Sequence, residues 1–81
     1  MIPSKCKIFI NNRYESKRIQ QILSNRGYRW LSGDEYYEPP YSHYYLIIKE
    51  HFISYLYGDR NQKEFQGIKD WYPEKINRID V

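Results

Sequence analysis

The chain has 81 residues, a net charge of +3, one cysteine and 19% aromatic residues. A chain this short forms one domain, here residues 1–81, and buries only about 60 to 65% of the surface that its unfolded form exposes, so its core is expected to be thin. The single cysteine excludes an internal disulfide, and the aromatic content excludes a disordered tail. Without a signal peptide or an apolar run of about 20 residues, the sequence predicts a cytoplasmic protein that has no membrane partner.

The charge is unevenly distributed along the chain. Residues 1–30 hold seven Lys or Arg against one acid, residues 31–59 hold one against five, and residues 60–81 hold five against four, which gives +6, −4 and +1. Proteins that bind nucleic acid usually keep a basic excess over one whole face. The acidic middle third therefore makes nucleic acid a less expected partner.

The N-terminal part of the chain predicts a strand followed by a helix. The alternation in "CKIFI" predicts a strand over Cys6–Ile10, with Lys7 and Phe9 on its second side. Asn12 and Glu15 then have the spacing of a capping box, and Gly27 is placed to end the helix in the left-handed conformation. The apolar face of this helix consists of Ile19, Ile22 and Leu23. Its outer face is expected to be solvated and carries Lys17, Arg18, Gln21 and Asn25.

The rest of the chain predicts three further strands. The segment "YRWL" over residues 28–31 alternates again, and a helical connection should make it parallel to the first strand. The segment "YYLIIKEHFISYLYG" predicts a hairpin broken at "KEH", although its turn lacks the favoured Asn-Gly pair. Residues 59–81 are expected to form a short helix or turn and a last edge segment, anchored by Phe65, Ile68, Trp71 and Ile76.

These elements predict an α+β fold with the order β-α-β-β-β, in which a single helix covers one face of one mixed sheet and an irregular C-terminal tail follows. The other face must be polar, or be closed by residues 33–45, by the tail or by a second copy of the chain. Because Tyr55 and Tyr57 alternate onto one face of their strand, a homo-oligomer is expected. The predicted core consists of Ile8, Ile10, Ile19, Ile22, Leu23, Trp30, Leu46, Ile48 and Leu56.

The most unusual segment is residues 33–45, "GDEYYEPPYSHYY", here called the tyrosine loop. It contains five tyrosines, three carboxylates, two prolines and one histidine, without helical or strand periodicity. Tyrosine-rich loops are typical of recognition surfaces, but the same rings can also cap a thin core. The adjacent prolines stiffen the segment. We expect a preorganised loop that packs its inner tyrosines and presents its outer ones.

The sequence favours no enzymatic chemistry. Cys6 has no histidine placed to activate it and is expected to be a small core residue. The four glycines are isolated, so they form no phosphate-binding loop. Acids beside two prolines are usually solvated, which argues against paired catalytic carboxylates at Asp34, Glu35 and Glu38. The best set of metal ligands matches no known spacing and comprises Glu35, Glu38, His43 and His51. No enzyme, metal site or cofactor is predicted.

Two classes of partner fit the remaining residues. In the favoured class the loop docks on a basic protein, with acids that steer the encounter and tyrosines that anchor it. The residues proposed for this role are Asp34, Glu35, Glu38, Tyr36, Tyr37, Tyr41 and Tyr44. In the alternative class the rings stack on the base of a nucleotide or of a single strand, while basic side chains hold the phosphates. The residues proposed for that second role are Arg13, Lys17, Arg26 and Arg29.

Three stretches of the sequence, taken in order, resemble a known group of proteins. They are "KIFINNRYESKRIQQILSNRGYRWLSG", the hairpin "LIIKEHFISYLYG" and the tail "KEFQGIKDWYP". Their order resembles a group of small bacteriophage accessory proteins, some of which inhibit host defence proteins while others sequester host nucleotide signals. The resemblance implies an accessory phage protein and transfers no catalytic residue. The chain departs from the group in its tyrosine-rich loop and in its hairpin turn.

Overall fold

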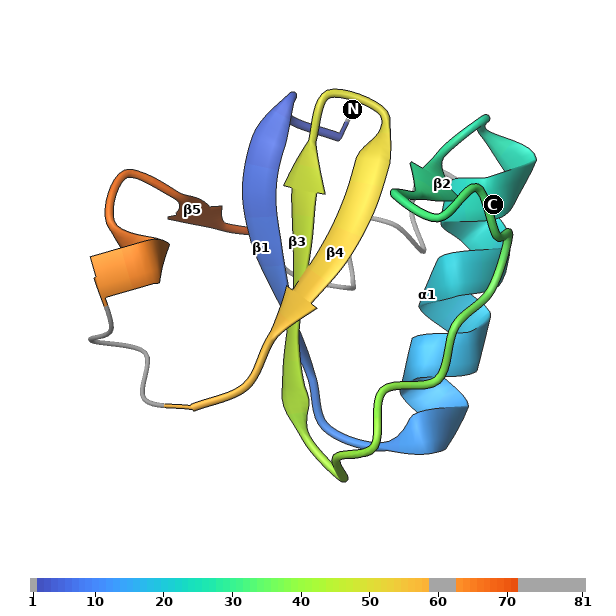
Figure 1. Ribbon diagram of the computed structural model, residues 1–81, viewed down its shortest axis with the longest axis horizontal. Helices are drawn as coiled ribbons and strands as arrows, with labels where there is room; N and C mark the ends of the chain where they lie inside the picture. The colour runs from blue at the N-terminus through green and yellow to red at the C-terminus, as the bar shows by residue number, and fades with distance from the viewer. Residues whose placement is uncertain (1, 59–62, 72–81) are drawn as a thin grey trace.

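The computed structural model of the chain describes residues 2–58 and 63–71, and it contains one five-stranded mixed sheet and one α-helix (Figure 1). This is the predicted α+β class. In chain order the elements are β1 (Lys5–Ile10), α1 (Arg13–Asn25), β2 (Arg29–Trp30), β3 (Tyr44–Lys49), β4 (Phe52–Leu56), the 3-10 turn η1 (Lys63–Phe65) and β5 (Lys69–Asp70). No helix in the described ranges is long and apolar enough to cross a bilayer.

The strands are arranged in the order β2-β4-β3-β1-β5. β1 is antiparallel to β3, β3 is antiparallel to β4, and β4 is parallel to β2. The first two strands therefore run in the same direction, as predicted, but the whole β3–β4 hairpin lies between them. This insertion places the residues that follow β2 beside the outer part of β4 rather than beside β1.

Both ends of α1 are capped as the sequence predicts. The side chain of Asn12 accepts a hydrogen bond from the backbone N–H of Glu15 at 2.8 Å. At the other end Gly27 has a φ of +89°, a left-handed conformation that glycine adopts without cost. The backbone N–H of Tyr28 then reaches the carbonyl of Leu23 at 3.0 Å, which is the hydrogen bond of a Schellman motif. The chain thus turns sharply into β2.

The main core lies between α1 and one face of the sheet (Figure 1). It holds eight of the nine predicted core residues, with Leu56 as the exception. That prediction was wrong because the β3–β4 register pairs Leu56 with Tyr45, and Tyr45 points away from the helix. The cluster also contains Cys6, Tyr28, Tyr44, Ile53 and Trp71.

The second face of the sheet is partly covered by the tail, one of the alternatives that the sequence left open. A smaller cluster forms there from Tyr45, Ile47, Phe65 and Ile68, with Leu56 packed against it. Lys7 is buried beneath this segment, donates a hydrogen bond to the carbonyl of Ile68 and lies 3.5 Å from the carboxylate of Asp70. Within residues 63–71, the edge strand β5 and the buried anchors Phe65, Ile68 and Trp71 agree with the predicted turn and edge segment. The predicted anchor Ile76 lies outside the described residues.

Burial of Cys6 predicts how stability depends on pH. Burial raises the pKa of its thiol from about 9 to about 11. Between these values the folded thiol stays protonated while the unfolded thiol ionises, so the contribution of Cys6 to the free energy of unfolding is fully present below pH 9 and is lost as the pH rises toward 11. Urea unfolding at a series of pH values should give a shallower decline for Cys6→Ala than for the wild type. Equal declines would contradict a buried thiol.

Candidate binding surface

Residues 33–43 of the tyrosine loop connect β2 to β3 and run alongside α1 in Figure 1, while Tyr44 and Tyr45 begin β3. The loop lies on the same side of the sheet as the helix. It therefore covers the edge of the main core near β4 and leaves the second face of the sheet untouched. Its position follows from the strand order, because the connection must pass from the outer strand β2 to the central strand β3.

Gln20 anchors this loop to the helix. Its side chain is fully buried, and its amide oxygen accepts hydrogen bonds from the indole N–H of Trp30 at 2.8 Å and from the backbone N–H of Tyr37 at 3.1 Å. Its amide nitrogen donates to the backbone carbonyl of Tyr37 and to the hydroxyl of Ser16, both at 2.9 Å. Every hydrogen-bonding group of the buried amide is thus satisfied, as burial requires.

Two further loop residues reach the interior. Pro39 is fully buried, and the Tyr44 ring is only 3% exposed, with its hydroxyl hydrogen-bonded to Ser16. Burial raises the pKa of the Tyr44 phenol, an effect that this hydrogen bond partly offsets. Tyr44 was one of the predicted binding residues, but in this fold its ring belongs to the core and is withdrawn from any partner.

The outer rings of the loop stack on β4 and on the residue after it. Tyr41 lies parallel to Tyr57, with ring centroids 4.0 Å apart and an interplanar angle of 8°. Tyr37 stacks on Tyr55 at 5.9 Å, Tyr41 contacts Tyr55 at 6.1 Å, and His43 lies 5.7 Å from Tyr57. We call this continuous set the aromatic ridge and define it as Tyr37, Tyr41, His43, Tyr55 and Tyr57.

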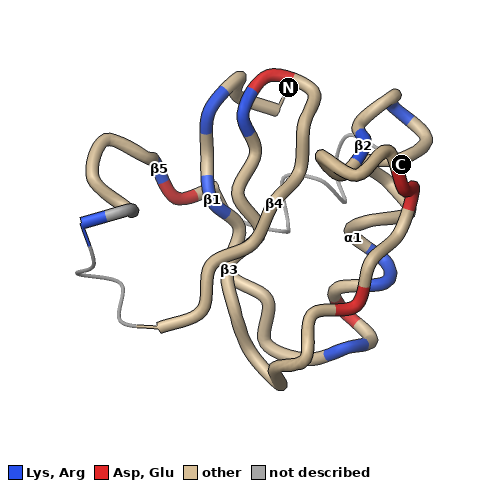
Figure 2. Tube along the Cα trace, viewed as in Figure 1, with Lys and Arg blue, Asp and Glu red and all other residues tan. Residues whose placement is uncertain are grey.

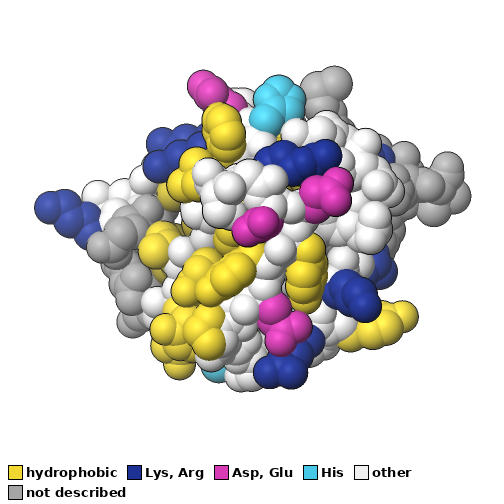
Figure 3. All heavy atoms as spheres, turned by 45° about the vertical axis from the view of Figure 1, so that its right-hand side comes forward, with side chains coloured by type: hydrophobic (Ala, Val, Ile, Leu, Met, Phe, Trp, Pro, Cys, Tyr) yellow, Lys and Arg dark blue, Asp and Glu magenta, His cyan; other side chains and the backbone are white. Residues whose placement is uncertain are grey.

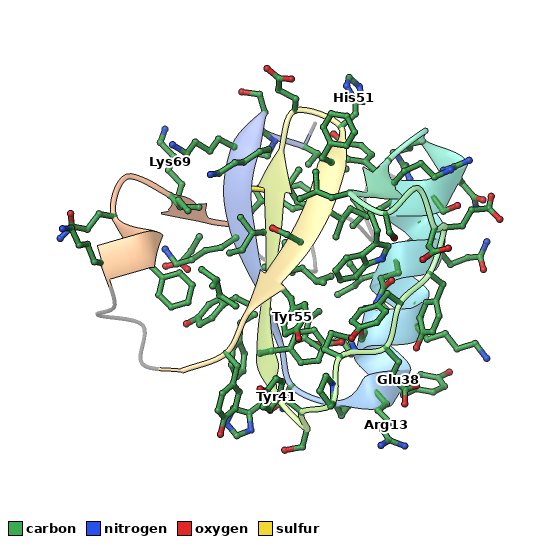
Figure 4. All side chains as sticks on the ribbon, viewed as in Figure 1. Arg13, Glu38, Tyr41, His51, Tyr55 and Lys69 are labelled. Carbon is green, nitrogen blue, oxygen red and sulfur yellow. The ribbon has the colours of Figure 1, made fainter. Side chains whose placement is uncertain are left out.

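The ridge reaches the surface. Tyr37, Tyr41 and Tyr57 remain 41%, 37% and 47% exposed although each makes ring contacts. Figure 4 shows Tyr41 and Tyr55 projecting toward each other, one from the loop and one from β4. Hydrophobic side chains gather at the lower left of the face that Figure 3 presents. The chain therefore displays aromatic rings that are already stacked and only partly solvated.

The loop acids lie beside basic side chains of the same molecule. Glu38 pairs with Arg13 at 3.4 Å, side by side in Figure 4, and also accepts a hydrogen bond from the Tyr36 hydroxyl at 3.3 Å. Glu35 pairs with Arg29 at 3.3 Å. Figure 2 shows the resulting mixture of acidic and basic segments along α1 and the loop. Such exposed pairs contribute little stability, but they balance the two charges locally.

Two of the predicted basic residues, Arg29 and Lys17, have different surroundings. The Arg29 guanidinium also donates to the backbone carbonyls of Ser24 at 3.0 Å and Tyr28 at 2.7 Å, so it mainly holds the C-terminal end of α1 to β2. Lys17 lies in the N-terminal half of α1 and lines a hollow of about 360 Å³. This hollow is also lined by Gln20, Gln21, Ser24, Asn25, Glu35 and Tyr36.

The structure thus brings the predicted tyrosines into three separate environments, of which the core position of Tyr44 is described above. Tyr37 and Tyr41 join the ridge, whereas Tyr36 lies beside Glu38. Tyr55 and Tyr57 were expected to face a second copy of the chain, but the loop of the same molecule stacks on them. The sequence missed this contact because it gives no distance between the loop and β4.

The structure brings no metal-binding group together in the described ranges, where no three His, Cys, Asp or Glu side chains come close enough to hold an ion.

No family model, curated protein or solved structure matches the chain. A function must therefore be inferred from the surface itself.

Proposed function

We propose that the chain is a non-enzymatic binding protein that docks on another protein through the aromatic ridge. The resemblance to phage accessory proteins makes a host protein the expected partner, with inhibition of a defence function in the host cytoplasm as the outcome. The observation that carries the proposal is the stacked and half-exposed pair of Tyr41 and Tyr57, 4.0 Å apart.

The ridge has the physical properties of an interface centre. Tyrosine offers a large contact area with only two side-chain torsions to immobilise, and rings that are already stacked lose less freedom when a partner binds. The hydrogen bonds of Gln20 to Tyr37 hold the loop in place before binding. The loop that carries Tyr37 and Tyr41 also carries the ion pairs of Glu35 and Glu38, and interfaces typically combine such polar groups with an aromatic centre.

The alternative proposal, sequestration of a nucleotide signal or binding of a single strand, is less well supported at these residues. It requires Arg13, Lys17 and Arg29 to hold phosphates. Arg13 and Arg29 instead lie within 3.4 Å and 3.3 Å of carboxylates, which repel phosphate. Arg29 is further occupied by two backbone carbonyls.

The aromatic ridge can be tested by capture of a partner from bacterial lysate. The double change Tyr41→Ala and Tyr57→Ala should abolish capture of the dominant protein, because each ring at an interface centre contributes about 2 kcal/mol or more. Quantitative mass spectrometry of the captured proteins measures the effect, and the affinity of the purified partner then confirms it.

Tyr14→Ala is the matched control for this experiment. Tyr14 is a tyrosine of α1 that is 82% exposed and lies outside the ridge, so its removal changes exposed aromatic area without touching the proposed interface. Capture should be retained. Equal loss in both variants, or no loss in the double variant, would contradict docking through the ridge.

A further inference from the structure

The second face of the sheet is left open toward the β3–β4 turn. The tail covers Tyr45 and Ile47 at the other end, but Phe52 remains 50% exposed and Leu31 remains 72% exposed. A hollow of about 560 Å³ lies here, within the range of about 300 to 1,000 Å³ that is usual for small-molecule sites. It is lined by Ser4, Lys5, Leu31, Lys49, Glu50, Phe52, Ile53 and Ser54.

Two lysines face each other in this hollow. The β1–β3 register pairs Lys5 directly with Lys49, and the β3–β4 register pairs Lys49 with Phe52. Paired residues point to the same side of a sheet, so the side chains of Lys5, Lys49 and Phe52 emerge in one row across three strands. Figure 2 shows the basic segments of β1 and β3 side by side next to the turn.

This row is unfavourable for the empty protein. Like charges directly opposite each other on neighbouring strands destabilise a sheet, and their Cβ atoms are only about 5 Å apart. Within the described residues neither Lys5 nor Lys49 forms an ion pair. An anion between the two side chains would relieve the repulsion. A doubly charged phosphate monoester suits two ammonium groups better than a single carboxylate does.

We propose that this hollow binds a nucleoside monophosphate. Its phosphate lies between Lys5 and Lys49, and its base stacks on the exposed face of Phe52, in the way that aromatic side chains receive bases in other proteins. Ser54 and Glu50 line the same hollow and offer hydrogen-bonding groups to the sugar. Unlike Glu35 and Glu38, Glu50 forms no ion pair with a described basic residue, so it does not occupy either lysine. This site lies on the opposite face of the sheet from the aromatic ridge and does not depend on it.

Titration calorimetry with adenosine 5′-monophosphate tests the proposal, with inorganic phosphate and adenosine as half-ligands. The intact nucleotide should bind more tightly than either half. Lys49→Glu should weaken its binding about tenfold or more, because a charge-assisted contact becomes a repulsive one. The same change should raise the urea midpoint of unfolding, because the introduced carboxylate faces Lys5. A loss of binding that accompanies a gain in stability cannot come from misfolding.

Three further variants locate the site. Phe52→Ala should weaken binding of the nucleotide but leave binding of inorganic phosphate unchanged. Lys17→Glu makes the same change in charge on α1, and the double variant Tyr41→Ala and Tyr57→Ala removes the ridge; both should bind the nucleotide as the wild type does. The proposal is overturned if Lys17→Glu weakens binding as much as Lys49→Glu, or if the nucleotide binds no better than phosphate. Marked preference for a short single-stranded oligonucleotide would also overturn it in favour of a polymer.

Discussion

Replacing Leu23 by alanine should lower the free energy of unfolding by about 2 to 5 kcal/mol, the usual cost of truncating a fully buried leucine. Leu23 has no exposed surface and packs between α1 and the sheet, and its carbonyl also accepts the hydrogen bond that ends the helix. Small domains are stable by only about 5 kcal/mol or slightly more, so this loss could remove most of the stability. Urea unfolding followed by tryptophan fluorescence measures it.

Leu31→Ala provides the matched control. Leu31 is 72% exposed on the other side of the sheet, so the same truncation should change the free energy of unfolding by no more than about 0.5 kcal/mol. If Leu23→Ala costs less than about 1 kcal/mol, or no more than the control, the helix face has been assigned wrongly.

Gln20→Leu is expected to have the second-largest effect. Leucine is close in size but cannot bond to Trp30 or Tyr37, so the indole N–H and both backbone groups of Tyr37 lose their buried partner. Each buried group left without a partner costs about 1 to 3 kcal/mol. Because water can enter the site and bond to some of these groups, we expect the free energy of unfolding to fall by about 3 kcal/mol in total. The loop should also loosen, which amide hydrogen exchange at Tyr37 would report.

Gln21→Leu makes the same chemical change at the next position, where the side chain is exposed and bonds only weakly to Asn25 at 3.4 Å. Stability and exchange at Tyr37 should stay close to wild type. If capture of the partner depends on a preorganised ridge, Gln20→Leu should weaken capture, whereas Gln21→Leu should leave capture unchanged. Normal hydrogen exchange in Gln20→Leu would show that Gln20 does not hold the loop.

Local sequence patterns predicted most of the fold. The alternation in residues 6–10, the Asn12 cap and the Gly27 stop depend on neighbours within a few residues, and the structure confirms each of them. The side on which Leu56 lies depends instead on the register of the hairpin. Its turn carries Glu50 at a φ of 58°, without the Asn-Gly pair that would have fixed the register in advance.

The candidate surface was harder to predict because it depends on long-range contacts. The sequence indicated that the loop would bury some rings and present others. It did not indicate that Tyr41 would stack on Tyr57, the residue that follows β4. Gln20 is the one residue whose position in the sequence could have indicated that the loop contacts the helix. It lies four residues after Ser16 and three before Leu23, so it falls on the apolar face of the helix, where a polar side chain needs a buried partner.

The position of β5 has a consequence for the order in which the molecule folds. β1 is made first during synthesis, yet it lies between β3 and β5, and its buried Lys7 bonds to a carbonyl 61 residues later in the chain. Contacts this distant in sequence slow folding, because a large loop must close before any of them forms. The first strand therefore acquires its last neighbour only after residues 68–70 leave the ribosome. Until then Ile47 and Tyr45 lack their cover, and the nascent sheet exposes an apolar face to other chains.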